Sequence, residues 1–209
     1  MRIYLVAAAV MALACKRAEP VVIPSESASA AATPQTTAGG TPSVPATPLS
    51  SSCGISGQPV LTDEGIGELR IGKSAAETKK LCDVVSDADQ QGSEGSMERI
   101  LAIRIGGEIV PATIVNDKVW RVAITTPRIR TADSLGVDSP LRKIASMRGA
   151  QFFPGEDGVY AFVADHCALS FRFSLPLRPP KGGQWTPTAI ATAHADAVVD
   201  RVLLTECRK

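Results

Sequence analysis

The chain has 209 residues, of which 44% are hydrophobic and only 4% aromatic, and its formal net charge is +1. This near-neutral charge gives no electrostatic basis for binding nucleic acid, and so few aromatic rings do not make an extended stacking platform. The length suits one globular domain with an additional tail.

Residues 1–14 have the pattern of a signal peptide. Arg2 supplies a positive charge, and the apolar run 3–14 is shorter than the roughly 20 residues that span a bilayer. The run ends in Ala12-Leu13-Ala14-Cys15, which resembles the lipobox of bacterial lipoproteins with the usual order of Leu and Ala reversed. The resemblance implies cleavage before Cys15 and lipidation of that cysteine. An ordinary signal peptide followed by an unrelated cysteine is the alternative.

The residue after the cysteine bears on the destination of the lipoprotein. Lys16 stands there instead of Asp, which is typical of sorting to the outer membrane in a host with two membranes. We therefore expect a lipid-anchored protein on the periplasmic face of the outer membrane. In a host with one membrane, the anchor is expected on the outer face of the plasma membrane. More than one acyl chain gives stable anchoring, where a single chain binds only marginally.

Residues 15–52 are predicted to be a disordered tether. Ser, Thr, Ala and Pro dominate this segment, and no hydrophobic period is visible in it. Such a composition cannot bury enough apolar surface to offset the entropy of ordering the chain. From Cys53 onward apolar alternation and turn signals appear, so a globular domain is predicted over residues 53–209.

The first half of this domain predicts a helix followed by strands. Ser74 and Glu77 form a capping box, and Ala75, Thr78, Leu81 and Cys82 then line one side of a short helix. A strand is predicted over 100–105, followed by a hairpin turn at Gly106-Gly107. After Asn116-Asp117 a further strand is predicted, with Trp120, Val122 and Ile124 on one face.

The second half repeats this order. Ser139 is predicted to cap a helix that has Pro140 at its first position and Gly149 as its stop. A hairpin is predicted to join 158–164 to 167–174 across Asp165-His166, and a last strand covers 198–206.

The fold class is therefore predicted as α+β: an antiparallel sheet with short helices packed on it, in two tandem helix-plus-hairpin repeats. Gly72-Lys73-Ser74 is aligned with Val137-Asp138-Ser139, and Asp117-Lys118-Val119 with Asp200-Arg201-Val202. A single continuous α+β meander is the alternative.

Tandem units of this kind resemble the β-lactamase-inhibitory protein and the small lipoproteins of outer-membrane assembly. Residues 65–74 are also similar to a phrase that opens many uncharacterised bacterial lipoproteins, with 131–139 as the counterpart in the second half. The resemblance covers 60–209, but its motifs mark turns and helix caps. It implies a fold and no binding residue.

Four cysteines remain besides Cys15, and an even number in an exported chain indicates two disulfides. Of the three possible pairings we favour Cys53 with Cys82 and Cys167 with Cys207, because each bond then closes within one half. The alternative is a metal site. It is not expected, because the sequence has no C-x-x-C and its only histidines are His166 and His194.

The stretch Gly67–Ser74 matches the P-loop pattern G-x-x-x-x-G-K-S, but we do not expect it to bind a nucleotide. Nucleoside triphosphates are scarce outside the cytoplasm, and a P-loop fold needs a parallel sheet where this chain offers hairpins. Leu69 and Ile71 alternate with polar residues as in a strand, and the capping box accounts for Ser74.

Other polar clusters have ordinary interpretations. Neighbouring strand residues point to opposite faces, so His166 and Cys167 are expected to be a turn histidine beside a disulfide cysteine. Two further clusters are a polar loop in which calcium is conceivable and a basic group whose default interpretation is a solvated face. Their residues are Asp87, Asp89 and Glu94 for the first, and Arg128, Arg130, Arg142 and Lys143 for the second.

Trp185 lies in the Pro/Gly-rich loop 176–187, where it is either a partner contact or a plug for the sheet edge. We predict no catalytic residue, no metal and no cofactor. The favoured function is a non-enzymatic protein-binding or scaffolding module, anchored in the cell envelope, with another envelope protein as its partner. An envelope hydrolase with an unrecognised site is the alternative.

Overall fold

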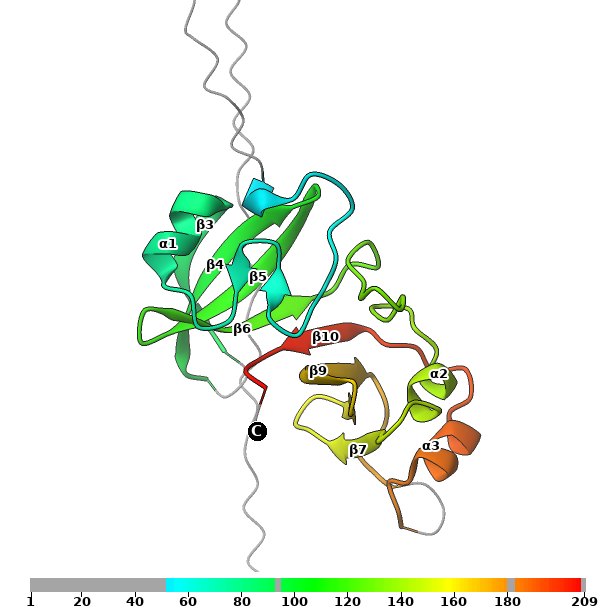
Figure 1. Cartoon of the computed structure of the whole chain (residues 1–209). Helices are drawn as coiled ribbons and strands as arrows, with labels where there is room; N and C mark the ends of the chain where they lie inside the picture. The colour runs from blue at the N-terminus through cyan, green and yellow to red at the C-terminus, as the bar shows by residue number, and fades with distance from the viewer. Residues whose placement is uncertain (1–51, 93–94, 180–182, 208–209) are drawn as a thin grey trace, which may run out of the picture. The chain divides into compact units, whose positions relative to one another are not determined.

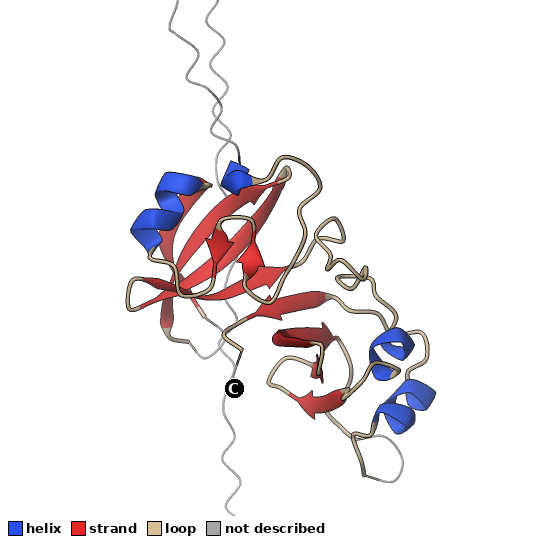
Figure 2. Cartoon of the chain, in the orientation of Figure 1, coloured by secondary structure: helices blue, strands red, loops and turns tan. Residues whose placement is uncertain are grey.

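The computed structural model describes residues 52–92, 95–179 and 183–207, so the predictions for the signal peptide, Cys15 and the tether lie outside the described residues. Runs of strands separated by short helices make up this part of the chain (Figures 1 and 2). In chain order they are η1 (Ser52–Gly54), β1 (Gly65–Ile66), β2 (Leu69–Arg70), α1 (Ala75–Leu81), β3 (Asp83–Gln91), β4 (Met97–Ile105), β5 (Glu108–Val115), β6 (Lys118–Ile124), α2 (Leu141–Ala145), β7 (Gln151–Pro154), β8 (Val159–Val163), β9 (His166–Phe173), α3 (Pro187–Ala193) and β10 (Arg201–Leu204).

The main sheet has eight strands in the order β3-β4-β5-β6-β10-β9-β8-β7, and all its neighbouring strands are antiparallel. Each half of the domain therefore supplies four strands, and the halves meet where β6 pairs with β10. In this register Ala123 lies opposite Leu203. An antiparallel sheet with a few short helices confirms the α+β prediction at this level. None of the helices in the described ranges is both long and apolar enough to cross a membrane.

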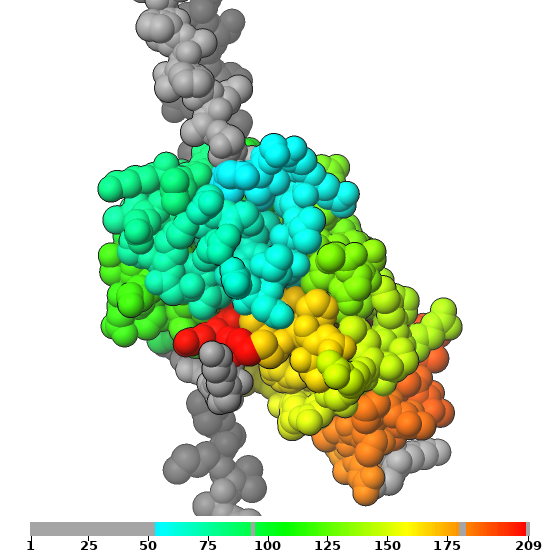
Figure 3. Space-filling model, in the orientation of Figure 1, coloured from blue at the N-terminus to red at the C-terminus, as the bar shows by residue number. Residues whose placement is uncertain are grey.

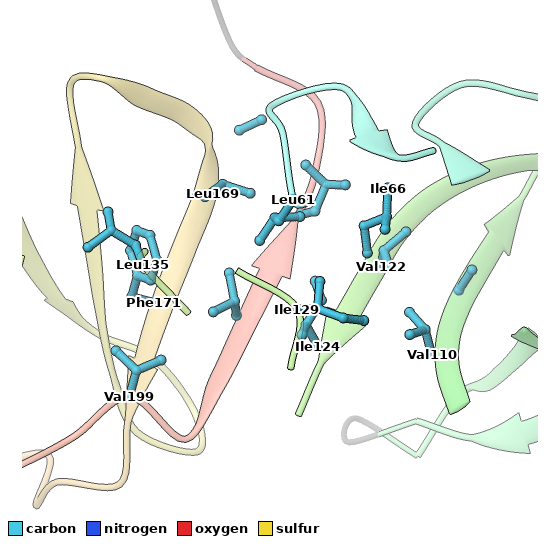
Figure 4. Close-up of a cluster of buried hydrophobic side chains, with 14 of the residues drawn as sticks. Leu61, Ile66, Val110, Val122, Ile124, Ile129, Leu135, Leu169, Phe171 and Val199 are labelled. Atoms are coloured by element: carbon cyan, nitrogen blue, oxygen red, sulfur yellow. The ribbon is translucent and has the colours of Figure 1, made fainter. Parts of the chain in front are cut away.

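One face of the sheet carries the hydrophobic core. Alternate residues of every central strand point into it, among them Val122, Ile124 and Phe171, all fully buried. The segment before α1 crosses this face, and Figure 4 shows its Leu61 and Ile66 lying against the sheet. In Figure 3 the same segment (cyan) covers much of the visible surface. All three α-helices contribute side chains to this core.

The same set of backbone hydrogen bonds occurs in both halves, where the residues before each helix pair with the chain at the start of the fourth strand. In the first half the donors and acceptors are Gly72 to Val119, Val119 to Lys73, and Ala75 to Asp117. In the second half the corresponding bonds run from Asp138 to Val199, from Val199 to Ser139, and from Leu141 to Ala197. All six distances lie between 2.8 and 2.9 Å. Gly72 and Asp138 also share a left-handed backbone, with φ of 82° and 66°.

The capping box of α1 is confirmed, because the Ser74 hydroxyl accepts from the Glu77 N–H and the Glu77 carboxylate accepts from the Ser74 N–H. The predicted cap of α2 is wrong. Pro140 is the N-cap of that helix, and the Ser139 hydroxyl accepts from the Gly136 N–H at 3.0 Å instead. The helix ends at Ala145, before the predicted stop.

The polar loop predicted around Asp87 is also wrong, since Asp83–Gln91 forms the edge strand β3 paired with β4. An edge strand that is exposed on almost every residue needs no apolar period, so its sequence reads as a loop. Asp87 is bound by Arg99 at 2.9 Å and by Lys79. Asp89 is exposed, and Glu94 lies outside the described residues.

One turn, one strand and one helix residue differ slightly from the prediction. The Gly106-Gly107 hairpin forms as predicted. The β8–β9 turn lies one residue earlier than predicted, because Val163 already pairs with His166. The last strand is shorter than predicted and begins at Arg201. Leu81, predicted to face the core, is 43% exposed.

Two disulfides join Cys53 to Cys82 and Cys167 to Cys207, which are the two pairings favoured from the sequence. The first links the start of the described domain to the end of α1. The second links β9 to the segment that follows β10. Each bond therefore closes within one half of the fold.

Candidate binding face

The second face of the main sheet is covered by none of the described helices. At its centre the exposed-side residues of successive strands are small: Ala102 on β4, Pro111 on β5, Ala123 on β6 and Ser170 on β9. Leu203 on β10 lies among them, opposite both Ala123 and Ser170. Small side chains leave the sheet backbone close to the surface, so this open face has a low floor at the junction of the two halves.

A hollow of about 540 Å³ lies over the part of this floor that Pro111, Ala123 and Leu203 form. Arginine–carboxylate pairs stand on its rim from both halves. Arg121 donates to Glu98 at 2.9 Å, and Arg201 lies 3.1 Å from Asp157. Tyr160 from β8 completes the rim. An apolar floor with a polar rim is the usual composition of a protein-binding patch.

A wider ion network holds the second-half side of this rim in place. Arg172 donates to Asp200 at 2.8 and 2.9 Å and pairs with Asp157 at 2.5 Å, and its own side chain is only 15% exposed. Burial alone would raise the pKa of Asp157, but hydrogen bonds from Tyr160 and Arg172 outweigh it and lower that pKa. Burial and the hydrogen bond to Asp157 raise the pKa of Tyr160 to about 12. The carboxylate is therefore charged and the phenol neutral across the physiological range.

Trp120 lies on the exposed surface, although the sequence pattern placed it in the core with Val122 and Ile124. The β5–β6 register shifts between Thr113 and Ile114, so Trp120 is the extra residue of a β-bulge. Val119 takes the core position and Trp120 is 48% exposed. Bulges re-aim side chains in this way, often beside functional sites. The spacing of the two buried valines, three residues apart, is the signal in the sequence that could have revealed the bulge.

A second hollow, of about 700 Å³, lies beside Trp120. It is bounded by the segment before α1, by the β5–β6 turn and by the residues after β10. Its lining combines the apolar Ile71 and Val119 with the charged Asp63, Lys118 and Glu206. Both hollows therefore combine apolar and charged side chains, but they are lined by different segments of the chain.

Trp185 is half-buried and packs against the core. It borders a shallow hollow together with Phe152 and Phe153 of the edge strand β7. This position suits a plug for the sheet edge, the second of the two roles considered for it. A contact role for Trp185 stays a prediction.

The P-loop-like stretch has no free set of amides with which to bind a phosphate. The N–H groups of Glu68, Ile71 and Gly72 donate to backbone carbonyls of this chain, at 2.8 to 3.1 Å. The lysine that a P-loop would direct at phosphates, Lys73, pairs with Glu68 at 2.7 Å. The stretch therefore serves the β1–β2 hairpin and the helix cap.

The remaining predicted positions are engaged within the fold. Arg130 donates to three backbone carbonyls and Lys143 to two, so neither belongs to a free basic patch. Arg128 pairs with Glu108 at 3.3 Å. His166 lies 3.2 Å from Asp133, and its neighbour Cys167 is in a disulfide, as expected.

Within the described ranges, no group of three His, Cys, Asp or Glu residues is arranged to hold a metal ion. Among the described hydrogen bonds, the ring of His166 pairs with Asp133, and none joins a histidine ring to a hydroxyl or a thiol. The described residues bring together a low apolar floor, paired charges on its rim and an exposed tryptophan nearby.

No protein-family model matches the chain, and no curated protein matches its sequence. Among solved structures, the fold is similar to the crystal structure of the uncharacterized protein yfeY from Escherichia coli. The TM-score is 0.52 and the sequence identity 12%, over 70% of this chain and 99% of that chain. At this identity the likeness shows a fold shared with a bacterial protein and carries no binding residue across.

Proposed function

We propose that this protein is a lipid-anchored cell-envelope lipoprotein whose domain binds another envelope protein, without catalysis, on the open face of its sheet. The observation that carries the proposal is the hollow on that face, with its apolar floor around Ala123 and Leu203. One face of an antiparallel sheet is commonly solvated, and such a face is normally polar. Here none of the described helices covers this face and the floor of its hollow is apolar, so a partner protein would cover it.

The envelope location is supported by the sequence and by the disulfides. The lipobox-like Ala12–Cys15 favours a lipid on Cys15, and Lys16 after it favours the outer membrane in a host with two membranes. In a host with one membrane the anchor would lie on the outer face of the plasma membrane. Disulfides form and persist in oxidising compartments outside the cytoplasm, and the two bonds of this domain suit such a location. The tether 15–52 would then hold the open face at some distance from the bilayer.

The two halves are, in this proposal, copies of one helix-plus-hairpin unit. The repeated backbone hydrogen bonds align Ser74 with Pro140, where the sequence alignment had Ser139. They align Val119 with Val199, where the sequence alignment had Val202. With this alignment Arg121 corresponds to Arg201. The identical residues V-x-R-V then stand at the same place in both central strands.

This equivalence places a pseudo-twofold axis at the centre of the hollow. Val122 pairs with Leu204 across the junction of the two halves. The counterparts of these two residues, Val202 and Ile124, also pair with each other. The axis then passes between Ala123 and Leu203. Each repeat contributes one arginine–carboxylate pair to the rim, which supports a single composite site built by both halves. A likeness to the β-lactamase-inhibitory protein belongs to this proposal and rests on architecture alone.

Crosslinking in living cells tests the proposal. A photoreactive residue at Phe162, which is exposed on the open face, should capture one dominant envelope protein. The matched control places the same residue at Ala76, which is exposed on α1 on the opposite face. A second control, Cys15→Ser, removes the anchor and should abolish the crosslink. Equal capture from both faces, or none from either, would contradict the proposal.

A hydrolase screen of the purified protein addresses the alternative. Turnover of any ester, amide or glycoside substrate that survives further purification would overturn the non-enzymatic assignment. The expected result is no turnover in the presence of a reproducible crosslink at Phe162.

A further inference from the structure

The repeat equivalence singles out Trp120 as a residue that the fold itself does not require. Its counterpart in the second half is Asp200. The N–H of Asp200 donates to the Arg172 carbonyl, and the next residue, Arg201, pairs with Arg172. There the Asp200 carboxylate is bound by the Arg172 guanidinium. In the first half the corresponding residues are Trp120 and Thr113. The first half thus has an exposed ring in the place of a closed ion pair.

The indole of Trp120 is held in a fixed orientation. The guanidinium carbon of Arg121 lies 5.0 Å from the centroid of the ring, and the same guanidinium donates to Glu98 at 2.9 Å. Cation–π contact with an anchored arginine restricts the ring and occupies one of its faces. The exposed surface of the ring is therefore preorganised for a ligand, which lowers the entropy cost of binding.

The hollow beside the ring offers hydrogen-bonding groups of both signs. Asp63 uses one carboxylate oxygen on the Ala168 N–H at 3.2 Å, which leaves the other available. Asn116, Lys118 and Glu206 are exposed, and in the described part of the chain neither Lys118 nor Glu206 takes part in an ion pair. Two carboxylates, one amide and one ammonium supply both acceptors and donors. The hollow is also lined by Glu64 and Arg70, which pair with each other at 2.8 Å.

We propose that the Trp120 hollow binds a saccharide chain. The C–H face of one pyranose ring would stack on the exposed indole face, whose π-electron density attracts weakly polar C–H groups. Its hydroxyls would donate to Asp63 and Glu206 and accept from Asn116 and Lys118. The nearly balanced charge of this set suits an uncharged polyhydroxy ligand better than a phosphate or a strongly basic peptide. One indole is enough for one pyranose, so the low aromatic content is no obstacle.

The volume and shape of the hollow agree with this ligand class. At about 700 Å³ it lies within the ordinary range for small-molecule sites. It is bounded on three sides by different segments of the chain and remains open to solvent, as a site for part of a longer polymer must be. This site is separate from the open-face partner site, because its lining and that of the first hollow share no residue.

Fluorescence of the full-length protein tests the saccharide site. Trp120 and Trp185 are the two tryptophans of the chain, so Trp185→Phe leaves Trp120 as the single indole reporter. Titration with chitotriose and with maltotriose should shift or quench its emission saturably for at least one of the two sugars. Free tryptophan amide with the same sugars provides the baseline. No saturable change with either sugar, combined with no polymer binding in the next experiment, would overturn the proposal.

Co-sedimentation distinguishes the two sources of such chains in an envelope. One arm uses insoluble peptidoglycan, and the other uses lipopolysaccharide micelles. Binding in either arm should fall about tenfold or more in Trp120→Ala, and much less in Trp120→Phe, which keeps an aromatic face. Trp185→Phe should bind normally. Binding that is unchanged in Trp120→Ala would overturn the site, whereas loss of the Phe162 crosslink alone would affect only the proposed protein partner.

Discussion

The guanidinium of Arg172 donates two hydrogen bonds to the carboxylate of Asp200, at 2.8 and 2.9 Å, and so joins the C-terminal end of β9 to the residue that precedes β10. The same guanidinium reaches Asp157 in the β7–β8 turn. One arginine therefore connects three segments of the second half. The arrangement stabilises the rim of the open-face hollow as well as the central pairing of β10.

Asp200→Asn is expected to lower the free energy of unfolding by about 1–3 kcal/mol, because it weakens a paired, largely buried Arg172 while keeping the size of the side chain. Urea denaturation measures the change. The control is Glu64→Gln, which removes the exposed partner of Arg70 and should cost no more than about 0.5 kcal/mol. Equal costs for the two variants would mean that the Arg172 network is not a structural element.

Tyr160 is expected to titrate near pH 12 in the folded protein, because burial and the hydrogen bond to Asp157 raise its pKa to about 12. The other tyrosine, Tyr4, belongs to the predicted signal peptide, so ultraviolet absorbance of the mature protein reports Tyr160 alone. A raised pKa means that the folded state favours the neutral phenol. The resulting stability is present below the ordinary pKa of 10.0 and is lost as the pH rises towards 12.

Asp157→Asn is the control for that titration. It removes the charge that opposes the phenolate, so the pKa of Tyr160 should move down towards 10.0. A midpoint near 10 in the unmodified protein would show that the Tyr160–Asp157 hydrogen bond does not form in solution.

Because of the bulge, truncation of the neighbouring β6 residues Val119 and Trp120 should lower the free energy of unfolding by very different amounts. Val119→Ala should lower the free energy of unfolding by about 1.5–3 kcal/mol, because Val119 is 1% exposed. Trp120→Ala should cost less than about 1 kcal/mol, chiefly through loss of the Arg121 contact. Thermal or urea unfolding measures both. A larger loss of stability for Trp120→Ala than for Val119→Ala would contradict the bulge and support the regular alternation that places Trp120 in the core.

The disulfides are expected to be a major source of stability. By the chain-entropy relation, crosslinks at sequence separations of 29 and 40 contribute about 4 kcal/mol each. Paired Ser substitutions at Cys53 and Cys82, and separately at Cys167 and Cys207, should lower the midpoint of urea unfolding in each case. Thiol titration of the unfolded, unreduced mature protein should find no free thiol among these four cysteines. Four free thiols would contradict both bonds.

The parts of the fold that sequence reasoning found are those with local causes. The capping box of α1 needs only Ser74 and Glu77, and the first hairpin needs only Gly106-Gly107. The edge strand β3 was not predicted, because an exposed strand has no buried face that would impose an apolar period on its sequence. Ser139 fitted the pattern of an N-cap, but its hydroxyl accepts a hydrogen bond from the Gly136 N–H instead.

The candidate sites were not predicted from the sequence, for a different reason. The hollow on the open face depends on the pairing of β6 with β10, and no local pattern specifies which strands become neighbours across the sheet. Trp120 is exposed because one extra residue shifts the β5–β6 register, which reverses the face of every position before it. An alternation scored over Trp120, Val122 and Ile124 cannot detect that shift.

The positions of the two disulfides have a mechanical consequence. Cys53 and Cys207 lie at the two ends of the described domain, and each is bonded to a residue well inside it. A pull on the chain preceding Cys53 passes through the covalent bond to Cys82 and loads the sheet at β3, so the intervening hairpin carries no tension. The segment after β10 is secured to β9 in the same way. While the two bonds are intact, the segments between the bonded cysteines cannot be pulled out by force on the chain ends, which instead enters the sheet at β3 and β9.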